Sequence, residues 1–70
     1  MNREPVASSN IAAIGYDEPS QTLEVEFTGG GIYQYYNVPQ PIFEQLMQSS
    51  SKGQFLAHQI KNSYAYSRTG

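Results

Sequence analysis

Residues 22–39 read TLEVEFTGGGIYQYYNVP and hold the strongest secondary-structure signals of the chain. In residues 22–28, polar and apolar side chains alternate at every position, which is typical of a strand with one buried face. Residues 32–36 are rich in aromatic side chains, which favour strands, and Asn37 and Pro39 end the run. The three glycines between the two segments therefore predict a β-hairpin.

The number of glycines in the turn determines which side chains of the two strands face each other. A turn of two glycines pairs Val25 with Gln34, which puts an amide among apolar side chains. A loop of all three glycines instead pairs Val25 with Tyr35 and Phe27 with Tyr33. We therefore predict the three-glycine register, in which Tyr33 and Tyr35 point into the core.

The regions on either side of the hairpin predict one more strand and two helices. The apolar residues 11–16 precede a turn-forming segment and indicate a strand. After Pro39 the apolar period becomes helical, Pro41 suits a first helical turn, and Ser51 with Gln54 has the spacing of a capping box. We expect an α+β fold: a three-stranded antiparallel β-meander, near residues 10–17, 21–28 and 32–38, followed by two short helices packed on one face. The predicted core comprises Ile14, Leu23, Val25, Phe27, Tyr33, Tyr35, Phe43, Leu46, Phe55 and Ile60.

The length of 70 residues, with no cysteine, predicts one small domain without disulfides. We expect a flexible N-terminal arm over residues 1–8 and a single domain over residues 9–68. No run of about 20 apolar residues is present, and the first residues lack the pattern of a signal peptide. We therefore expect a cytoplasmic protein without a membrane partner.

The titratable residues do not form a pattern typical of an enzyme. His58 is the only histidine and the chain has no cysteine, so we expect no metal site and no cofactor. Glu24 and Glu26 share one face of a strand, where we expect them to lie in solvent and keep the sheet soluble. We therefore expect no catalytic residues and no enzymatic activity.

The distribution of charge favours a binding role. The net charge is −2, but residues 45–70 contain three basic residues and no acidic residue. Within this part, Ser51, Lys52 and Gly53 begin the second predicted helix, where backbone N–H groups and a cation suit a phosphate. The hypothesis is a module that binds RNA or another phosphate-bearing ligand. Its candidate ligand-binding residues are Ser51, Lys52, Gly53, Lys61, Arg68 and the outward-facing Tyr36.

The alternative hypothesis is a protein–protein interaction module. Its contact surface would be the outer face of the sheet or an edge strand, with Glu24, Gln34 and Tyr36 in contact with the partner. A purely structural role also stays open for these candidates: Ser51 can cap a helix, and the cations can keep a helix soluble.

Motifs along most of the chain resemble those of the KTSC domain. They are Ser9 and Ile11, Gly15-Tyr16-Asp17, Leu23-Glu24-Val25-Glu26-Phe27, Gly31, Tyr33-Gln34-Tyr35, Val38-Pro39, Ser51-Lys52-Gly53, Phe55, Ile60 and Tyr64. The resemblance implies a family that is found at the C-terminus of some lysyl-tRNA synthetases and as small stand-alone bacterial and phage proteins. It implies no established activity, and RNA binding only by association with the synthetase.

Overall fold

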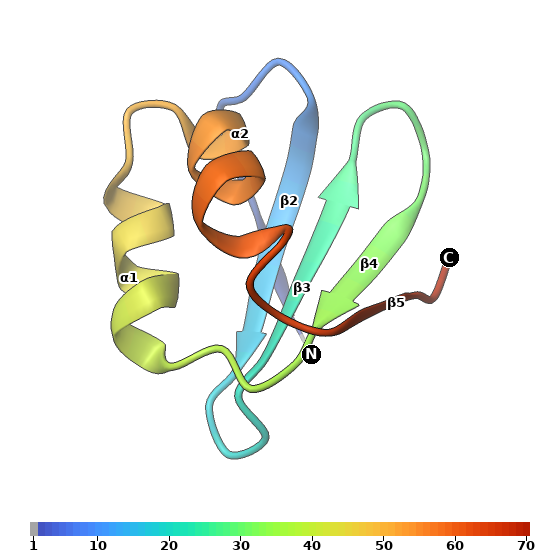
Figure 1. Ribbon diagram of the computed structural model, residues 1–70. Helices are drawn as coiled ribbons and strands as arrows, with labels where there is room; N and C mark the ends of the chain where they lie inside the picture. The colour runs from blue at the N-terminus through green and yellow to red at the C-terminus, as the bar shows by residue number, and fades with distance from the viewer. Residues whose placement is uncertain (1) are drawn as a thin grey trace.

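The computed structural model describes residues 2–70 and contains an antiparallel sheet with helices on one face (Figure 1). The α+β class is confirmed, but the sheet has five strands and not three. The strands lie in chain order: β1 (Arg3–Pro5), β2 (Ile11–Asp17), β3 (Thr22–Phe27), β4 (Ile32–Tyr35) and β5 (Tyr66–Arg68).

The helical part follows β4 and covers one face of the sheet (Figure 1). It consists of α1 (Gln40–Gln48), α2 (Lys52–Phe55) and a π-helical segment, η1 (Leu56–Ile60), that continues directly from α2. A proline stands in the first turn of α1, as predicted. The predicted capping box is wrong: the Ser51 side chain makes no cap, and its backbone N–H donates to Ser49 Oγ at 3.1 Å. No helix within residues 2–70 is long and apolar enough to cross a membrane.

The predicted hairpin register is wrong by two residues. Val25 lies opposite Tyr33, and Leu23 lies opposite Tyr35. Because the side chains of a strand alternate between faces, a shift of two residues leaves every side chain on its predicted face. Gln34 accordingly lies opposite Glu24 on the face away from the helices.

The shift arises because the three-residue loop begins one position earlier than we predicted. Thr28, Gly29 and Gly30 form the loop: the Phe27 carbonyl accepts from the N–H of Gly30, and the N–H of Phe27 donates to the Gly31 carbonyl, both at 3.1 Å. Gly30 and Gly31 have φ angles of 96° and 101°, which L side chains rarely adopt. Two of the three glycines are thus required by the backbone, and Gly31 begins the ladder instead of ending the loop.

The core lies between the sheet and the helices. Its buried cluster comprises Ile11, Ile14, Leu23, Val25, Tyr35, Val38, Leu46, Leu56 and Ile60. Six of these were predicted. The four other predicted members, Phe27, Tyr33, Phe43 and Phe55, are only partly buried and pack against this cluster. Phe43 stacks on Tyr16 with ring centroids 4.6 Å apart, which attaches α1 to the sheet.

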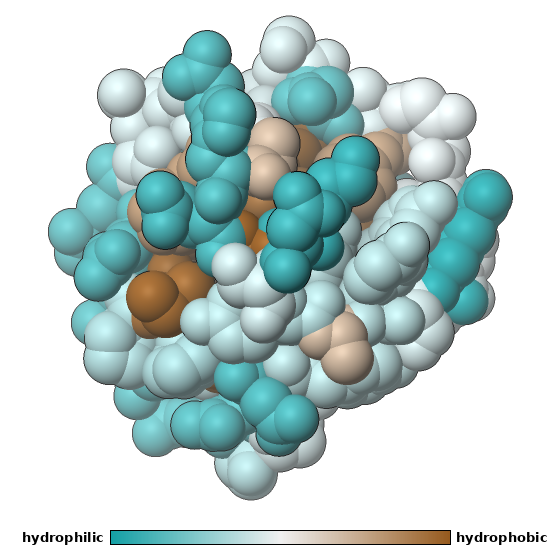
Figure 2. Space-filling view, viewed as in Figure 1, coloured by the Kyte–Doolittle hydropathy of each residue, from teal (hydrophilic) through white to brown (hydrophobic). Residues whose placement is uncertain are grey.

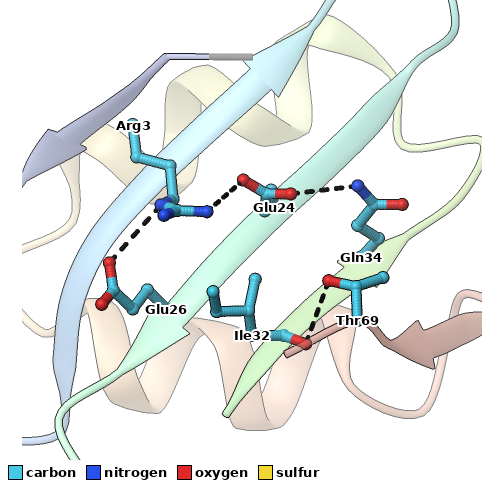
Figure 3. Close-up of polar contacts among 6 residues, drawn as sticks. All are labelled: Arg3, Glu24, Glu26, Ile32, Gln34 and Thr69. Atoms are coloured by element: carbon cyan, nitrogen blue, oxygen red, sulfur yellow. Dashed lines mark hydrogen bonds and ion pairs between the residues drawn. The ribbon is translucent and has the colours of Figure 1, made fainter. Parts of the chain in front are cut away.

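Both edge strands come from the ends of the chain. β1 lies within the segment for which we predicted a flexible arm, and it pairs with β2 so that Glu4 is opposite Ile14; residue 1 lies outside the described residues. β5 pairs with β4, and just beyond it Thr69 donates its N–H to the Ile32 carbonyl at 2.7 Å and its hydroxyl to the same oxygen at 3.4 Å (Figure 3). The last residues of the chain therefore complete the sheet.

Candidate functional site

A cleft of about 480 Å³ lies between η1 and the helix-facing side of β3, β4 and β5. We call it the aromatic cleft because four of its lining residues are Phe27, Tyr33, Tyr35 and Tyr66. The other lining residues are Asn10, Gly30, Gly53, Leu56, Ala57 and Lys61. Figure 2 shows this side of the molecule as mostly polar, with apolar atoms recessed between polar side chains. The volume falls in the range of about 300–1,000 Å³ that is typical of ligand sites.

The rings in the aromatic cleft hold one another in place. The ring centroid of Tyr66 lies 5.7 Å from that of Tyr35 and 5.9 Å from that of Tyr33. Tyr33 in turn makes an edge contact with Phe27 at 5.5 Å. Burial, reinforced by the two neighbouring tyrosines, raises the pKa of Tyr35, so its phenol stays protonated and can donate a hydrogen bond. Tyr66 is nevertheless 57% exposed and is the only large hydrophobic side chain so exposed among residues 2–70.

Two cations lie beside these rings. Lys61 lines the aromatic cleft. The guanidinium carbon of Arg68 lies 5.9 Å from the ring centroid of Tyr33, and Arg68 Nε donates to the Gly70 carbonyl at 2.9 Å. A Cβ on Gly31 would lie 3.3 Å from Tyr33 Cε1, so glycine allows this close approach. No acidic residue lines the cleft in the described part of the chain.

A second hollow, of about 470 Å³, adjoins the aromatic cleft. We call it the serine hollow; its lining comprises Ala7, Ser8, Ser9, Asn10, Ser50, Ser51, Lys52, Gly53, Gln54, Ala57 and His58. Asn10, Gly53 and Ala57 line both spaces. A Cβ on Gly53 would lie only 2.6 Å from Asn10 Oδ1, so the contact between these two residues depends on the glycine.

The structure divides the predicted site residues into two groups. Ser51, Lys52 and Gly53 lie at the serine hollow, while Gly53 and Lys61 line the aromatic cleft. Arg68 lies next to Tyr33 of the aromatic cleft. The Lys52 ammonium group is already engaged, since it donates to the Ser49 carbonyl at 3.1 Å.

Tyr36, the sixth candidate, belongs to the opposite face of the sheet. Its hydroxyl contacts Ser67 Oγ at 2.5 Å and donates to Gln34 Oε1 at 3.4 Å. Gln34 lies opposite Glu24 on the face away from the helices, so Tyr36 does not share a surface with Lys61. One continuous site therefore cannot contain all six candidates.

A polar network covers this outer face of the sheet (Figure 3). Arg3 Nη1 lies 2.6 Å from Glu24 Oε2, and Gln34 Nε2 donates to Glu24 Oε1 at 3.0 Å. Figure 3 shows the Arg3 side chain lying across β2, where the register places Gly15 between Arg3 and Glu24.

The prediction that Glu24 lies in solvent is wrong, because the residue is only 8% exposed. The hydrogen bond from Gln34 is the largest influence and lowers the pKa of Glu24; burial opposes it, and Arg3 lowers the pKa further. Glu26 contacts Arg3 Nε at 3.4 Å, but its side chain is 42% exposed. Among residues 2–70, no group of three or more histidine, cysteine, aspartate or glutamate residues is placed to hold a metal ion.

Sequence reasoning missed Tyr66 and Asn10 as members of a site. The alternation of Tyr64, Ala65, Tyr66 and Ser67 is compatible with a strand along the sheet and equally with a segment that extends along the helices. It could not show that this strand pairs with β4, because the pairing depends on the path of the helices between them. Nothing in the sequence around Asn10 indicates its contact with Gly53.

Comparison with known proteins places the chain in a family. The model of the KTSC domain matches residues 7–64. The chain belongs to the KTSC domain family. A crystal structure of a KTSC domain protein from Yersinia pestis superimposes with a TM-score of 0.95 at 39% sequence identity, covering 99% of this chain and 97% of that one.

The relatives include both small proteins and synthetases. A protein from Tsukamurella paurometabola is 45% identical over 58 residues, which cover 83% of this chain and 87% of that protein. A lysine–tRNA ligase from Nostoc sp. is 41% identical over 58 residues, again 83% of this chain but only 10% of the ligase. The same domain thus occurs within a much longer enzyme and in a protein of similar length.

Proposed function

We propose that the protein is a non-enzymatic module that binds RNA on the side of the sheet that carries the helices. The observation that carries the proposal is the aromatic cleft, which combines an exposed tyrosine with Lys61 and has no acidic lining residue in the described chain. RNA-binding proteins commonly recognise unpaired bases with aromatic rings and phosphates with cations.

The separation of charge explains how a protein of net charge −2 can attract a polyanion. Lys52 and Lys61 line the two hollows, and Arg68 lies beside the aromatic cleft. Glu24 and Glu26 lie on the opposite face, where Arg3 neutralises part of their charge. A ligand approaching the aromatic cleft therefore meets local cations and no acidic lining residue within residues 2–70, although the whole chain is acidic.

The synthetase relatives support RNA as the ligand class. A lysine–tRNA ligase contains a segment 41% identical to this chain, and that enzyme is named for a tRNA. The support is by association, since the segment is a tenth of the ligase. The relative of similar length shows that the domain also occurs outside the synthetase.

The proposal is tested by titrating the protein with short single-stranded RNA and recording amide NMR shifts at several salt concentrations. We expect shifts at Asn10, Gly53, Ala57, Lys61 and Tyr66 that persist near physiological salt. The variant Lys61→Gln should weaken binding, whereas Tyr36→Phe, on the opposite face, should not. An absence of shifts on the helix side, or shifts that vanish as salt is raised, would contradict the proposal.

The alternative function, protein binding through the outer face or an edge strand, has one observation in its favour. β1 and β5 are both exposed edge strands of three residues, and such edges can accept an added strand. The outer face itself is less suitable, because the polar groups of Glu24, Gln34 and Tyr36 already bond to neighbours within the chain. This alternative would be favoured if adding a protein partner, in the absence of RNA, shifted amide NMR signals only in β1 or β5.

A further inference from the structure

We infer that the aromatic cleft takes one unpaired nucleobase of the RNA, stacked on the exposed face of Tyr66, with an adjacent phosphate at Lys61. This inference rests on the proposed function and names the chemistry of recognition within it. It assigns a role to the tyrosine that is most exposed and to the strand, β5, that the sequence did not predict.

The first step is that Tyr66 presents a ring already held for stacking. Tyr33 and Tyr35 lie 5.9 and 5.7 Å from it, at interplanar angles of 46° and 37°. With these two contacts Tyr66 is still 57% exposed, so a large part of the residue stays accessible to a base. A ring fixed in this way loses little conformational entropy when a base stacks on it.

The second step is that the charge beside the rings selects an anionic ligand. Aromatic clefts also bind cations such as quaternary ammonium groups. Lys61 in the lining and Arg68 beside Tyr33 would repel a cation, and no acidic residue lines the cleft in residues 2–70. A flat ring joined to a phosphate satisfies both the tyrosines and Lys61.

The third step is that the cleft accepts an unpaired base and not a duplex. Stacking on Tyr66 needs a base with a free face, and a base inside a duplex has none because its neighbours cover both faces. Asn10 lines the same cleft; its Oδ1 already accepts from Ser8 Oγ at 3.2 Å, and its amide NH2 offers a donor to a base edge. Single-stranded RNA is therefore the form that fits.

The test compares an oligouridylate of about five nucleotides with an abasic ribose-phosphate chain of the same length, which carries the charge but no bases. We expect the protein to bind the oligouridylate about tenfold more tightly than the abasic chain, since stacking is lost in the latter. Tyr66→Ala should remove that difference and leave the abasic chain unaffected, while Tyr66→Phe should retain it. Lys61→Gln should weaken both ligands equally and reduce the salt dependence of each by about one phosphate contact.

A measurement on the unaltered protein tests the stacking site even if Tyr66→Ala does not fold. The ring protons of Tyr66 should shift when uridine monophosphate is added and should stay in place when ribose 5-phosphate is added. The stacking site, but not RNA binding, would be overturned by two results together. Oligouridylate would bind Tyr66→Ala and the unaltered protein with the same affinity, and it would leave the Tyr66 ring signals of the unaltered protein unmoved. Oligouridylate that fails to bind the unaltered protein would overturn both.

Discussion

The outer face of the sheet carries polar groups that bond to one another, whereas the helix-facing side carries cations beside aromatic rings. On the outer face, Arg3, Glu24 and Gln34 form a row from β1 to β4, held by contacts of 2.6 and 3.0 Å. On the helix side, neither Lys61 nor Arg68 pairs with an aspartate or glutamate side chain among residues 2–70. Alternate residues of the same strands thus build a polar outer face, while the helix-facing side carries both the buried core and the rings and cations of the aromatic cleft.

The contrast is largest in the contribution of each face to folding. Leu23 is fully buried under the helices, while Glu26, on the same strand, points to the outer face. We expect Leu23→Ala to lower the free energy of unfolding by about 3 kcal/mol, because it removes apolar burial and leaves a cavity. Chemical denaturation would measure the loss. The matched variant Glu26→Ala should cost under about 1 kcal/mol, since its ion pair is partly exposed; equal losses would refute the assignment of faces.

The outer network predicts a loss of stability in acid. The hydrogen bond from Gln34 and the charge of Arg3 hold the pKa of Glu24 below its ordinary value of 4.5. A carboxyl group with a lowered pKa in the folded state stabilises that state above its ordinary pKa, and this contribution is lost as pH falls through the folded value. We expect Glu24→Gln to lower the free energy of unfolding by about 1 to 2 kcal/mol at neutral pH. The difference from the unaltered protein should shrink as pH falls below 4.5.

Arg3 provides the control for this prediction. If the network acts as described, Arg3→Gln should destabilise the unaltered protein and have little further effect in the Glu24→Gln background. The network would be contradicted if the difference in the free energy of unfolding between the unaltered protein and Glu24→Gln stayed constant from pH 2 to 7.

The sequence predicted the faces of the strands better than their pairing. Alternation places Leu23 and Val25 on one face and Glu24 on the other whatever the register. The register itself depends on a loop that starts at Thr28, and the choice between loop positions is made by backbone hydrogen bonds that the glycine count does not reveal. β1 escaped prediction because three exposed residues that include a proline carry no apolar alternation.

The candidate site was predictable only in part for a similar reason. A basic C-terminal region indicated Lys52, Lys61 and Arg68, and the structure places all three beside the two hollows on the helix side. Tyr36 was an attractive candidate because strand alternation turns it outward, but its hydroxyl is held by Ser67. The place of Tyr66 in the cleft depends on the pairing of β5 with β4. This pairing joins partners 31 residues apart, so local sequence pattern cannot predict it.

The smallest change in the free energy of unfolding is expected at the boundary between the aromatic cleft and the serine hollow. Gly53→Ala should gain about 1 kcal/mol in helix propensity, but its Cβ would lie 2.6 Å from Asn10 Oδ1 and force that side chain to move. We therefore expect the single variant to change the free energy of unfolding by under about 0.5 kcal/mol, as the two effects offset each other. In an Asn10→Ala background the crowding is absent, so the same substitution should stabilise by up to about 1 kcal/mol. Thermal unfolding of the four proteins measures this coupling, and strictly additive effects would show that Asn10 and Gly53 do not form the boundary between the two spaces.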